Sequence, residues 1–301
     1  MGRKTRYLPD DTHLVEVTCR VIQRRFLLRP SPWLKAIIIG TLARFQERHG
    51  MGICGLIYLS NHCHLLLRLE TVEQLAGFMR GVNSKIAREA GRLHGWREKL
   101  WGRRYTDVVT SHEPEAQVDR LRYLLEQGCK EGLVVSPRHW PGASSTRALL
   151  SGERIEGLWI DRTEQYRASE RGEPNADALF TSVHQLELSP LPCWDELAPP
   201  QRQAKIRAMV REIEQQMDGV EVLGKKAICG QDPHDRPASH PRRTPAPRFH
   251  ASAPHVRRAL EIGYHLMRIA YRQAFEDWRA GKMAKFPAGC FAPGRFVPLR
   301  R

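Results

Sequence analysis

The sequence predicts an α+β protein, with a ferredoxin-like antiparallel sheet and its helices first and a mostly helical C-terminal region after it. Up to about residue 150, segments rich in β-branched residues alternate with segments of helical periodicity. Their order is strand, helix, strand, strand, helix, strand and a trailing helix, which is the split βαβ arrangement. Beyond that point only two helices and a Pro-rich stretch stand out.

The four expected strands are short runs of apolar and β-branched residues bounded by turn residues. The second and third follow each other directly, with a break at Ser60 and Asn61 between them. The strands are expected at residues 12–22, 52–60, 62–70 and 105–111.

The three helices between and after these strands carry apolar residues three or four positions apart. The first has the clearest ends, because Ser31 can cap it, Pro32 suits its first position and Gly50 can stop it. The third should end near Gly128 or Gly132. The helices are expected at residues 31–50, 71–95 and 113–132.

Two parts of the chain are predicted, with residues 8–150 as the ferredoxin-like domain and residues 151–301 as a basic C-terminal region. The second part should contain one helix over residues 199–219 and a last helix over about residues 255–280. The stretch before the last helix, residues 231–254, is rich in Pro, His and Arg and is expected to extend without a core of its own.

The charge balance favours a polyanionic partner. Of 301 residues, 48 are Lys or Arg and 33 are Asp or Glu, which gives a formal net charge of +15. Such an excess attracts nucleic acid first and anionic membrane second. The apolar run "KAIIIG" is far too short to span a bilayer, and no signal segment opens the chain. We therefore expect a cytoplasmic, nucleoid-associated protein, monomer or homodimer, that does not bind membrane.

The cysteines predict neither a disulfide framework nor a zinc knuckle. They are odd in number, scattered and never spaced as Cys-x-x-Cys, so we expect reduced thiols. They are Cys19, Cys54, Cys63, Cys129, Cys193, Cys229 and Cys290.

Two histidines open the apolar strand at residues 62–70. Residues two apart in a strand share a face, so His62 and His64 point one way while Cys63 and Leu65 point towards the core. The imidazoles should lie side by side on the open face, about 7 Å apart along the strand, close enough to hold one divalent cation. The spacing alone fits two solvated surface histidines equally well.

The helix after the fourth strand offers partners for this pair. At 100° per residue, an apolar stripe that includes Leu121 and Leu125 lies opposite Arg120, Tyr123 and Gln127. An amide oxygen and a phenol therefore project together from one face. The alternative for Tyr123 is a half-buried aromatic ring that packs on a neighbour.

Five cationic residues are candidate phosphate contacts. Arg80, Lys85 and Arg88 lie on the side of the second helix opposite its apolar stripe, and Arg103 and Arg104 precede the fourth strand. An ordinary solvated basic face explains the first three as well.

Four stretches resemble motifs of the single-tyrosine HUH transposases, and most closely the REP-associated tyrosine transposase group. "LSNHCHLLLRLE" is similar to the family's strand motif of Asn, His, a hydrophobic residue, His and a leucine run. "RYLLEQGCKEGLV" resembles its helix end, "WGRRYTDVV" its Trp-x-x-Arg-Tyr/Phe segment, and "PRHWPGASS" its Trp-Pro exit from the domain. The resemblance spans about residues 8–150, and it departs at Cys63 and at "EQGCK", where Asn-Pro-Val is usual.

The resemblance implies the HUH nuclease fold, with Tyr123 as nucleophile and His62, His64 and Gln127 as ligands of Mg²⁺ or Mn²⁺. It implies cleavage and rejoining of single-stranded, hairpin-forming repeat DNA through a 5′-phosphotyrosine. The residue types fit, because a phenol with a pKa near 10 needs a Lewis acid to break a phosphodiester at neutral pH. Imidazole ligands suit Mn²⁺ better than Mg²⁺.

Two other functions compete with this expectation. The chain could be a catalytically reduced, domesticated protein that only binds hairpin DNA, although intact His62, His64 and Tyr123 argue against it. It could also be a metal-dependent phosphoesterase that uses water and forms no adduct on Tyr123. A structural zinc protein is least favoured, because no cysteine pair has ligand spacing.

Overall fold

The computed structural model describes residues 5–9, 12–238 and 247–293, and its first half follows the predicted order of elements. Each strand and helix lies within a few residues of its expected position. The elements are β1 (Leu14–Arg20), α1 (Pro32–His49), β2 (Gly52–Tyr58), β3 (His62–Arg68), α2 (Val72–His94), β4 (Thr106–Thr110) and α3 (Pro114–Lys130).

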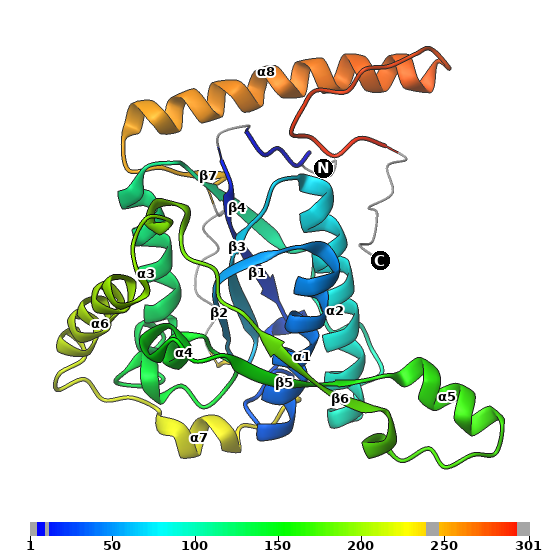
Figure 1. Cartoon of the computed structure of the whole chain (residues 1–301), viewed down its shortest axis with the longest axis vertical. Helices are drawn as coiled ribbons and strands as arrows, with labels where there is room; N and C mark the ends of the chain where they lie inside the picture. The colour runs from blue at the N-terminus through cyan, green and yellow to red at the C-terminus, as the bar shows by residue number, and fades with distance from the viewer. Residues whose placement is uncertain (1–4, 10–11, 239–246, 294–301) are drawn as a thin grey trace.

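The strands form a five-stranded sheet in the order β2-β3-β1-β4-β7, where β7 is Phe249–His250 (Figure 1). β1 pairs antiparallel with both β3 and β4, and β3 pairs antiparallel with β2. With α1 after β1 and α2 after β3, this strand order is that of the ferredoxin-like fold. The predicted fold class is confirmed.

The ends of α1 and α2 follow from local chemistry. The Ser31 hydroxyl accepts a hydrogen bond from the backbone N–H of Leu34 at 3.1 Å and so caps α1. Gly50 ends α1 with a left-handed φ of 59°, and Gly95 ends α2 with a φ of 64°. Thr71 caps α2 in the same way as Ser31 caps α1. Ser31 and Gly50 therefore begin and end α1 as the sequence predicted.

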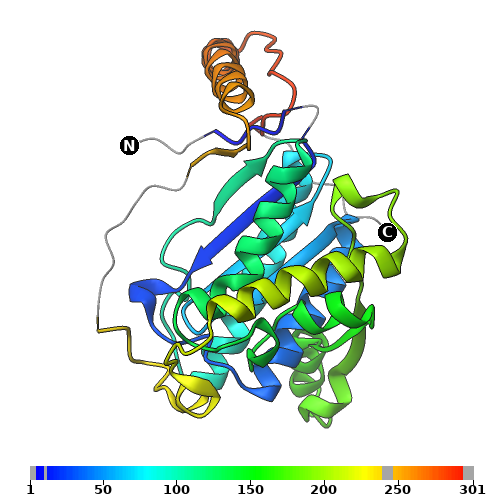
Figure 2. The same ribbon diagram turned by 90° about the vertical axis from the view of Figure 1, so that its left-hand side faces the viewer.

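Both faces of the sheet are covered by helices. α1 and α2 pack on the face that receives Cys63, Leu65 and Leu67 of β3. α3 lies across the other face, where Leu66 packs against Leu121 of that helix (Figure 2). The leucines point as the alternation predicted, but the face that carries the histidines is covered by α3 and is not open.

The region after residue 150 is mostly helical, as predicted, but it also contains a two-stranded antiparallel sheet, β5-β6, that the sequence did not reveal. The expected helices over residues 199–219 and 255–280 are present as α6 and α8. From residue 146 onwards the elements are α4 (Thr146–Ser151), β5 (Ile155–Ile160), α5 (Arg162–Glu170), β6 (Thr181–Leu186), α6 (Pro199–Gln216), α7 (Gly224–Gly230), β7 and α8 (Pro254–Arg279). Across the whole described structure, one-turn helices lie at Ile22–Arg24, Pro137–His139, Asp177–Phe180 and Pro192–Trp194.

A glycine contact lets β5 approach α1 closely. A Cβ atom on Gly157 would lie 2.1 Å from the backbone nitrogen of Gly40, and a Cβ on Gly40 would lie 2.3 Å from the carbonyl of Leu158. Only glycine fits where two backbones come this near. The β5-β6 sheet is thereby held close against α1.

The end of the predicted linker joins the sheet, which the expectation for residues 231–254 did not include. Phe249 is 2% exposed and belongs to the main core, and β7 pairs with β4 in parallel. Residues 239–246 of that stretch lie outside the described residues. α8 follows β7 and lies beyond the end of the sheet (Figure 1), where Tyr264 and Met267 join the same core. The division into residues 8–150 and 151–301 stays a prediction.

The structure bears on the expectations for membrane-spanning segments and for the cysteines. Within the described residues, no helix combines the length and the apolar character that crossing a membrane requires. Cys19, Cys54, Cys63 and Cys129 are buried free thiols, as their scattered spacing predicted.

Candidate active site

Three aromatic side chains that the sequence singled out meet at one end of the sheet. The rings of His62 and His64 on β3 are 5.2 Å apart between centroids, and their planes are at 76°. The ring of Tyr123 on α3 lies 5.7 Å from that of His64. The fold therefore brings together the predicted nucleophile and the predicted histidine pair, because α3 crosses the sheet where β3 begins.

Both imidazoles are held through Nδ1. The Nδ1 of His62 is 2.6 Å from Oδ1 of Asn61, and the Nδ1 of His64 is 2.8 Å from Oε1 of Glu16. Thr18 adds a weaker contact to His64 at 3.3 Å. Neither Nε2 atom has a hydrogen-bond partner among the described residues. Histidines that ligate metals usually donate their other ring N–H to a carboxylate or carbonyl in this way.

Glu16 holds the imidazole of His64 in place, a role that the sequence alone did not reveal. The side chain is only 3% exposed on β1, and its second oxygen accepts a hydrogen bond from Arg120 at 3.1 Å. Burial alone would raise the pKa of Glu16, but the hydrogen bonds and charges of His64 and Arg120 hold it below its usual value. An ionised Glu16 can only accept a hydrogen bond, so Nδ1 of His64 carries a proton and Nε2 is the ring nitrogen left to face a ligand. The available signal was a single acidic residue inside the apolar segment "LVEVTCR".

His62 is held in its neutral form. Burial lowers the pKa of His62 well below its usual value, and the nearby His64, Arg20 and Arg24 lower it further. A neutral imidazole is the form that binds metal ions.

Positive charge surrounds the ring of Tyr123. The guanidinium carbon of Arg120 lies 4.6 Å from the ring centroid, and the Lys130 Nζ lies 4.8 Å from it. The tyrosine is half-buried, and its ring packs against that of His64. The two cations give this end of the sheet a positive potential beside the phenol.

Gln127 lies one turn after Tyr123 and is 2% exposed. Its Nε2 donates to the carbonyl oxygen of Tyr123 at 2.8 Å, and no described residue hydrogen-bonds its Oε1. An amide oxygen and two imidazole Nε2 atoms form a donor set that suits a divalent cation. Among the described residues no three His, Cys, Asp or Glu side chains are grouped to hold a metal. A cation here would therefore depend on Gln127 or on oxygens of the substrate.

The predicted phosphate contacts separate into two groups. Arg80, Arg103 and Arg104 converge on a cavity of about 340 Å³ between α2 and the loop after it, and Arg88 is exposed further along α2. Lys85 does not belong with them. It is 4% exposed, and its Nζ bonds to Glu89 on its own helix at 2.9 Å and to a carbonyl oxygen of β5 at 2.6 Å. The assignment of Lys85 to a basic face is wrong, because β5 covers that position.

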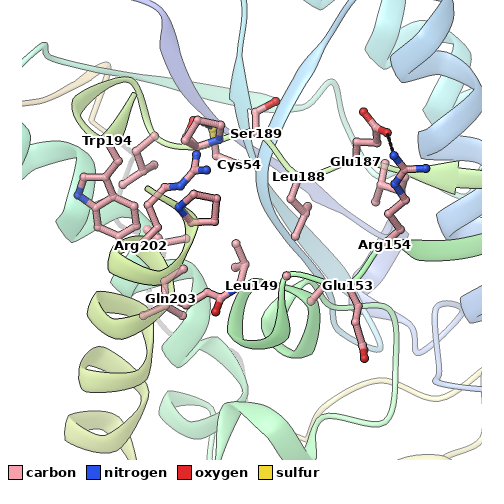
Figure 3. A pocket seen from close by; sticks show the side chains of 18 residues that line it. Cys54, Leu149, Glu153, Arg154, Glu187, Leu188, Ser189, Trp194, Arg202 and Gln203 are labelled. Carbon is pink, nitrogen blue, oxygen red and sulfur yellow. Dashed lines mark hydrogen bonds and ion pairs between the residues drawn. The ribbon is translucent and has the colours of Figure 1, made fainter. Parts of the chain in front are cut away.

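Another cavity, of about 320 Å³, lies between α4, α6 and residues 186–194 (Figure 3). Its labelled lining residues include Cys54, Trp194 and Arg202, and the ion pair of Arg154 with Glu187 closes one side at 3.3 Å. Burial raises the pKa of Cys54 to about 12, so its thiol is not a nucleophile at neutral pH. The cavity contains none of the predicted site residues.

Comparison with known proteins gives structural matches only. No family model and no curated protein matches the sequence. One similar solved structure is a REP-associated tyrosine transposase bound to a REP hairpin, with 14% sequence identity, a TM-score of 0.42, and coverage of 50% of this chain and 86% of that chain. A second is a candidate transposase from Deinococcus radiodurans R1, with 16% identity, a TM-score of 0.29, and coverage of 40% of this chain and 95% of that chain.

Proposed function

We propose that the chain is a transposase-type, metal-dependent single-stranded DNA endonuclease and strand transferase that acts on hairpin-forming repeat DNA. One observation carries the proposal: the ring of Tyr123 lies 5.7 Å from that of His64, whose Nδ1 is held by a buried carboxylate while Nε2 has no described partner. A phenol beside two imidazoles whose Nε2 atoms have no described partner suits a phosphoryl transfer that is assisted by a metal. The net charge of +15 supports a DNA partner.

The reaction transfers a phosphodiester bond to the tyrosine and back. Tyr123 loses its proton and its Oη bonds to phosphorus, while the bond from phosphorus to the 3′-oxygen breaks and that oxygen takes up a proton. A divalent cation, Mn²⁺ or Mg²⁺, held by His62, His64 and Gln127 would polarise the phosphate and offset its developing charge. Arg120 and Lys130 supply fixed positive charge beside the ring. Because one phosphodiester replaces another, a 3′-hydroxyl can reverse the step without ATP.

The test is the polarity of the covalent adduct. The full chain is incubated with Mn²⁺ and a single-stranded hairpin that carries a label at either its 5′ or its 3′ end, and the products are separated under denaturing conditions. A 5′-phosphotyrosine retains the 3′ part of the DNA, so only the 3′-labelled substrate should give a labelled protein. Cleavage without any adduct would instead support the water-using phosphoesterase. Hairpin binding without cleavage would support the catalytically reduced protein.

A further inference from the structure

The geometry points to a second DNA site: a groove along α2, on the side of the sheet away from Tyr123, that binds the single-stranded segment flanking the hairpin. This inference rests on the proposed function. The α2 groove consists of the 340 Å³ cavity and a neighbouring one of about 580 Å³. The two cavities share Asn83, Lys99 and Trp101 and are therefore adjacent.

The charge of the α2 groove is unbalanced. Among its described lining residues Glu98 is the only acidic one. Six cationic side chains line the groove and have no carboxylate partner among the described residues. They are Arg80, Arg88, Arg97, Lys99, Arg103 and Arg104. Lys85 on the same helix differs from them, because it is paired with Glu89. A groove with this surplus attracts a phosphate backbone and releases its counterions.

Two tryptophans supply flat surfaces inside this basic groove. Trp101 is held in place because its Nε1 donates to the carbonyl oxygen of Asn83 at 2.9 Å. Trp96 is held from one side by Arg25, whose guanidinium carbon is 5.2 Å from the ring centroid, and by the imidazole of His234 at 5.8 Å. Unpaired bases stack on such rings, whereas duplex bases are already stacked on each other. The combination favours single-stranded over double-stranded DNA.

The smaller cavity contains polar atoms without a partner. Arg6 is 6% exposed and stacks over the ring of Tyr105 at 4.0 Å. The Nη2 of Arg6 and the Oη of Tyr105 have no hydrogen-bond partner among the described residues, and the carboxylate of Asp107 is 3.6 Å from the Nε of Arg6. Buried polar groups are normally satisfied. Unsatisfied donors at the base of a basic pocket indicate a ligand rich in acceptors, as a phosphate or a base is.

The α2 groove is connected to the candidate active site by the end of β1. Arg20 pairs with His62 across the sheet, and its carbonyl oxygen accepts a hydrogen bond from Gly102 at 3.0 Å. The guanidinium of Arg20 lies within electrostatic range of both Tyr123 and Arg103. A strand that leaves Tyr123 would therefore pass Arg20 and Arg103 and enter the groove over the end of the sheet.

The length of the α2 groove sets the length of the flank. Its lining residues on α2 and at its C-terminal cap run from Ala76 to Gly95, about 28 Å at 1.5 Å per residue. This distance fits about eight nucleotides at the spacing of a B-form strand, and fewer when the strand is extended. We therefore expect a flank of about five to eight nucleotides to fill the groove.

The experiment measures the binding of three DNA probes to the full chain by fluorescence anisotropy. They are a blunt hairpin, the same hairpin with an eight-nucleotide single-stranded flank at its 5′ end, and the same hairpin with that flank at its 3′ end. Trp96→Ala should weaken binding of one flanked hairpin by about tenfold or more, and should change binding of the blunt hairpin by less than twofold. Trp96→Phe should retain most of the affinity. Trp278→Ala on α8 and Arg211→Ala on α6 remove an exposed tryptophan and an exposed arginine elsewhere and should leave all three affinities unchanged.

A second measurement uses the unsubstituted chain, so its result does not depend on whether the variants fold. A flank that carries 5-iodouracil should crosslink to the peptide that contains Trp96 or Trp101. The DNA site in the α2 groove would be overturned if Trp96→Ala weakened binding of the blunt and flanked hairpins equally, or if crosslinks formed only outside residues 76–105. Either result would leave the proposed function intact. An unsubstituted chain that binds no DNA would overturn both.

Discussion

Replacing Glu16 with Gln should weaken metal binding more than it weakens the fold. The carboxylate bridges two groups, the Nδ1 of His64 at 2.8 Å and the Nη1 of Arg120 at 3.1 Å. Gln has one acceptor and one donor end, so it can satisfy only one of them. If its oxygen faces Arg120, its amide N–H₂ faces His64 and forces the imidazole proton onto Nε2. In that tautomer the lone pair is on Nδ1, where it accepts from the Gln amide, so Nε2 has none to offer a metal.

The size of the effect follows from these two bonds. Hydrogen bonds to charged groups contribute about 1.5–3 kcal/mol each, so losing one should lower the free energy of unfolding by about that amount. Substitution of groups that orient a metal ligand typically costs 10- to 100-fold in metal affinity. We therefore expect Glu16→Gln to raise the Mn²⁺ concentration for half-maximal cleavage by 10- to 100-fold while the protein remains folded at 25 °C.

Two assays separate the roles of Glu16. Isothermal titration calorimetry measures Mn²⁺ binding, and urea denaturation measures stability. Glu212→Gln provides the control, since it also removes a carboxylate that pairs with an α3 arginine but lies exposed on α6, and it should leave Mn²⁺ binding unchanged. A Glu16→Gln protein that loses stability but binds Mn²⁺ as tightly as the unsubstituted chain would refute the argument.

Three further outcomes are expected. His62→Ala or His64→Ala should abolish cleavage but keep most of the DNA affinity in anisotropy titrations, because basic residues supply that affinity; parallel loss of both would indicate a structural role for the pair. DNA binding should weaken steeply between 50 and about 200 mM salt, and salt-insensitive binding would contradict the DNA assignment. Acid should destabilise the fold, because hydrogen bonds and charges from Arg162 and Lys85 outweigh burial and lower the pKa of Glu89. That stability is present above the unfolded pKa of about 4.3 and is lost as the pH falls through the lower folded value; urea denaturation at pH 7, 4 and 3 measures it, and Glu89→Gln should reduce the difference.

The sequence predicted the ferredoxin-like half of the fold because each of its elements has a local cause. The alternation in β3 placed His62 and His64 together on one face, and the turn residues placed the ends of α1. Its failures concern contacts between distant segments. Lys85 has the helical position of a surface cation, but β5 covers it and Glu89 pairs with it. No periodicity in the sequence of α2 can show that the end of a strand from residues 155–160 will reach Lys85.

The C-terminal region was harder to predict for the same reason. β7 is only two residues long and lies at the sheet edge, where pairing with β4 and burial of Phe249 define it more than local propensity does. β5 contains a glycine, which weakens a strand pattern, yet Gly157 is what allows the contact with α1. Glu16 was missed because an isolated carboxylate acquires a role only when β3 and α3 bring it His64 and Arg120.

The structure distinguishes Tyr123 from two other tyrosines of the same half of the chain, Tyr58 and Tyr105. Tyr58 belongs to the core on the α1–α2 side of the sheet, opposite the histidines, and burial raises its pKa well above the usual value. Burial also raises the pKa of Tyr105, which lies in the α2 groove. A raised phenol pKa means less phenolate at neutral pH and a weaker nucleophile. Of these three, Tyr123 alone contacts His64.

Tyr123 should therefore be the residue that becomes covalently attached to DNA. Tyr123→Phe keeps the ring that packs between Arg120 and His64, so binding and fold should persist, while the adduct and cleavage should disappear. Tyr58→Phe removes an oxygen on the other side of the sheet and is the matched control, with adduct formation expected to continue. Digestion of the adduct and mass spectrometry would locate the nucleotide. Finding it on Tyr58 or Tyr105, or finding an adduct in Tyr123→Phe, would show that the contact between Tyr123 and His64 is packing rather than catalysis.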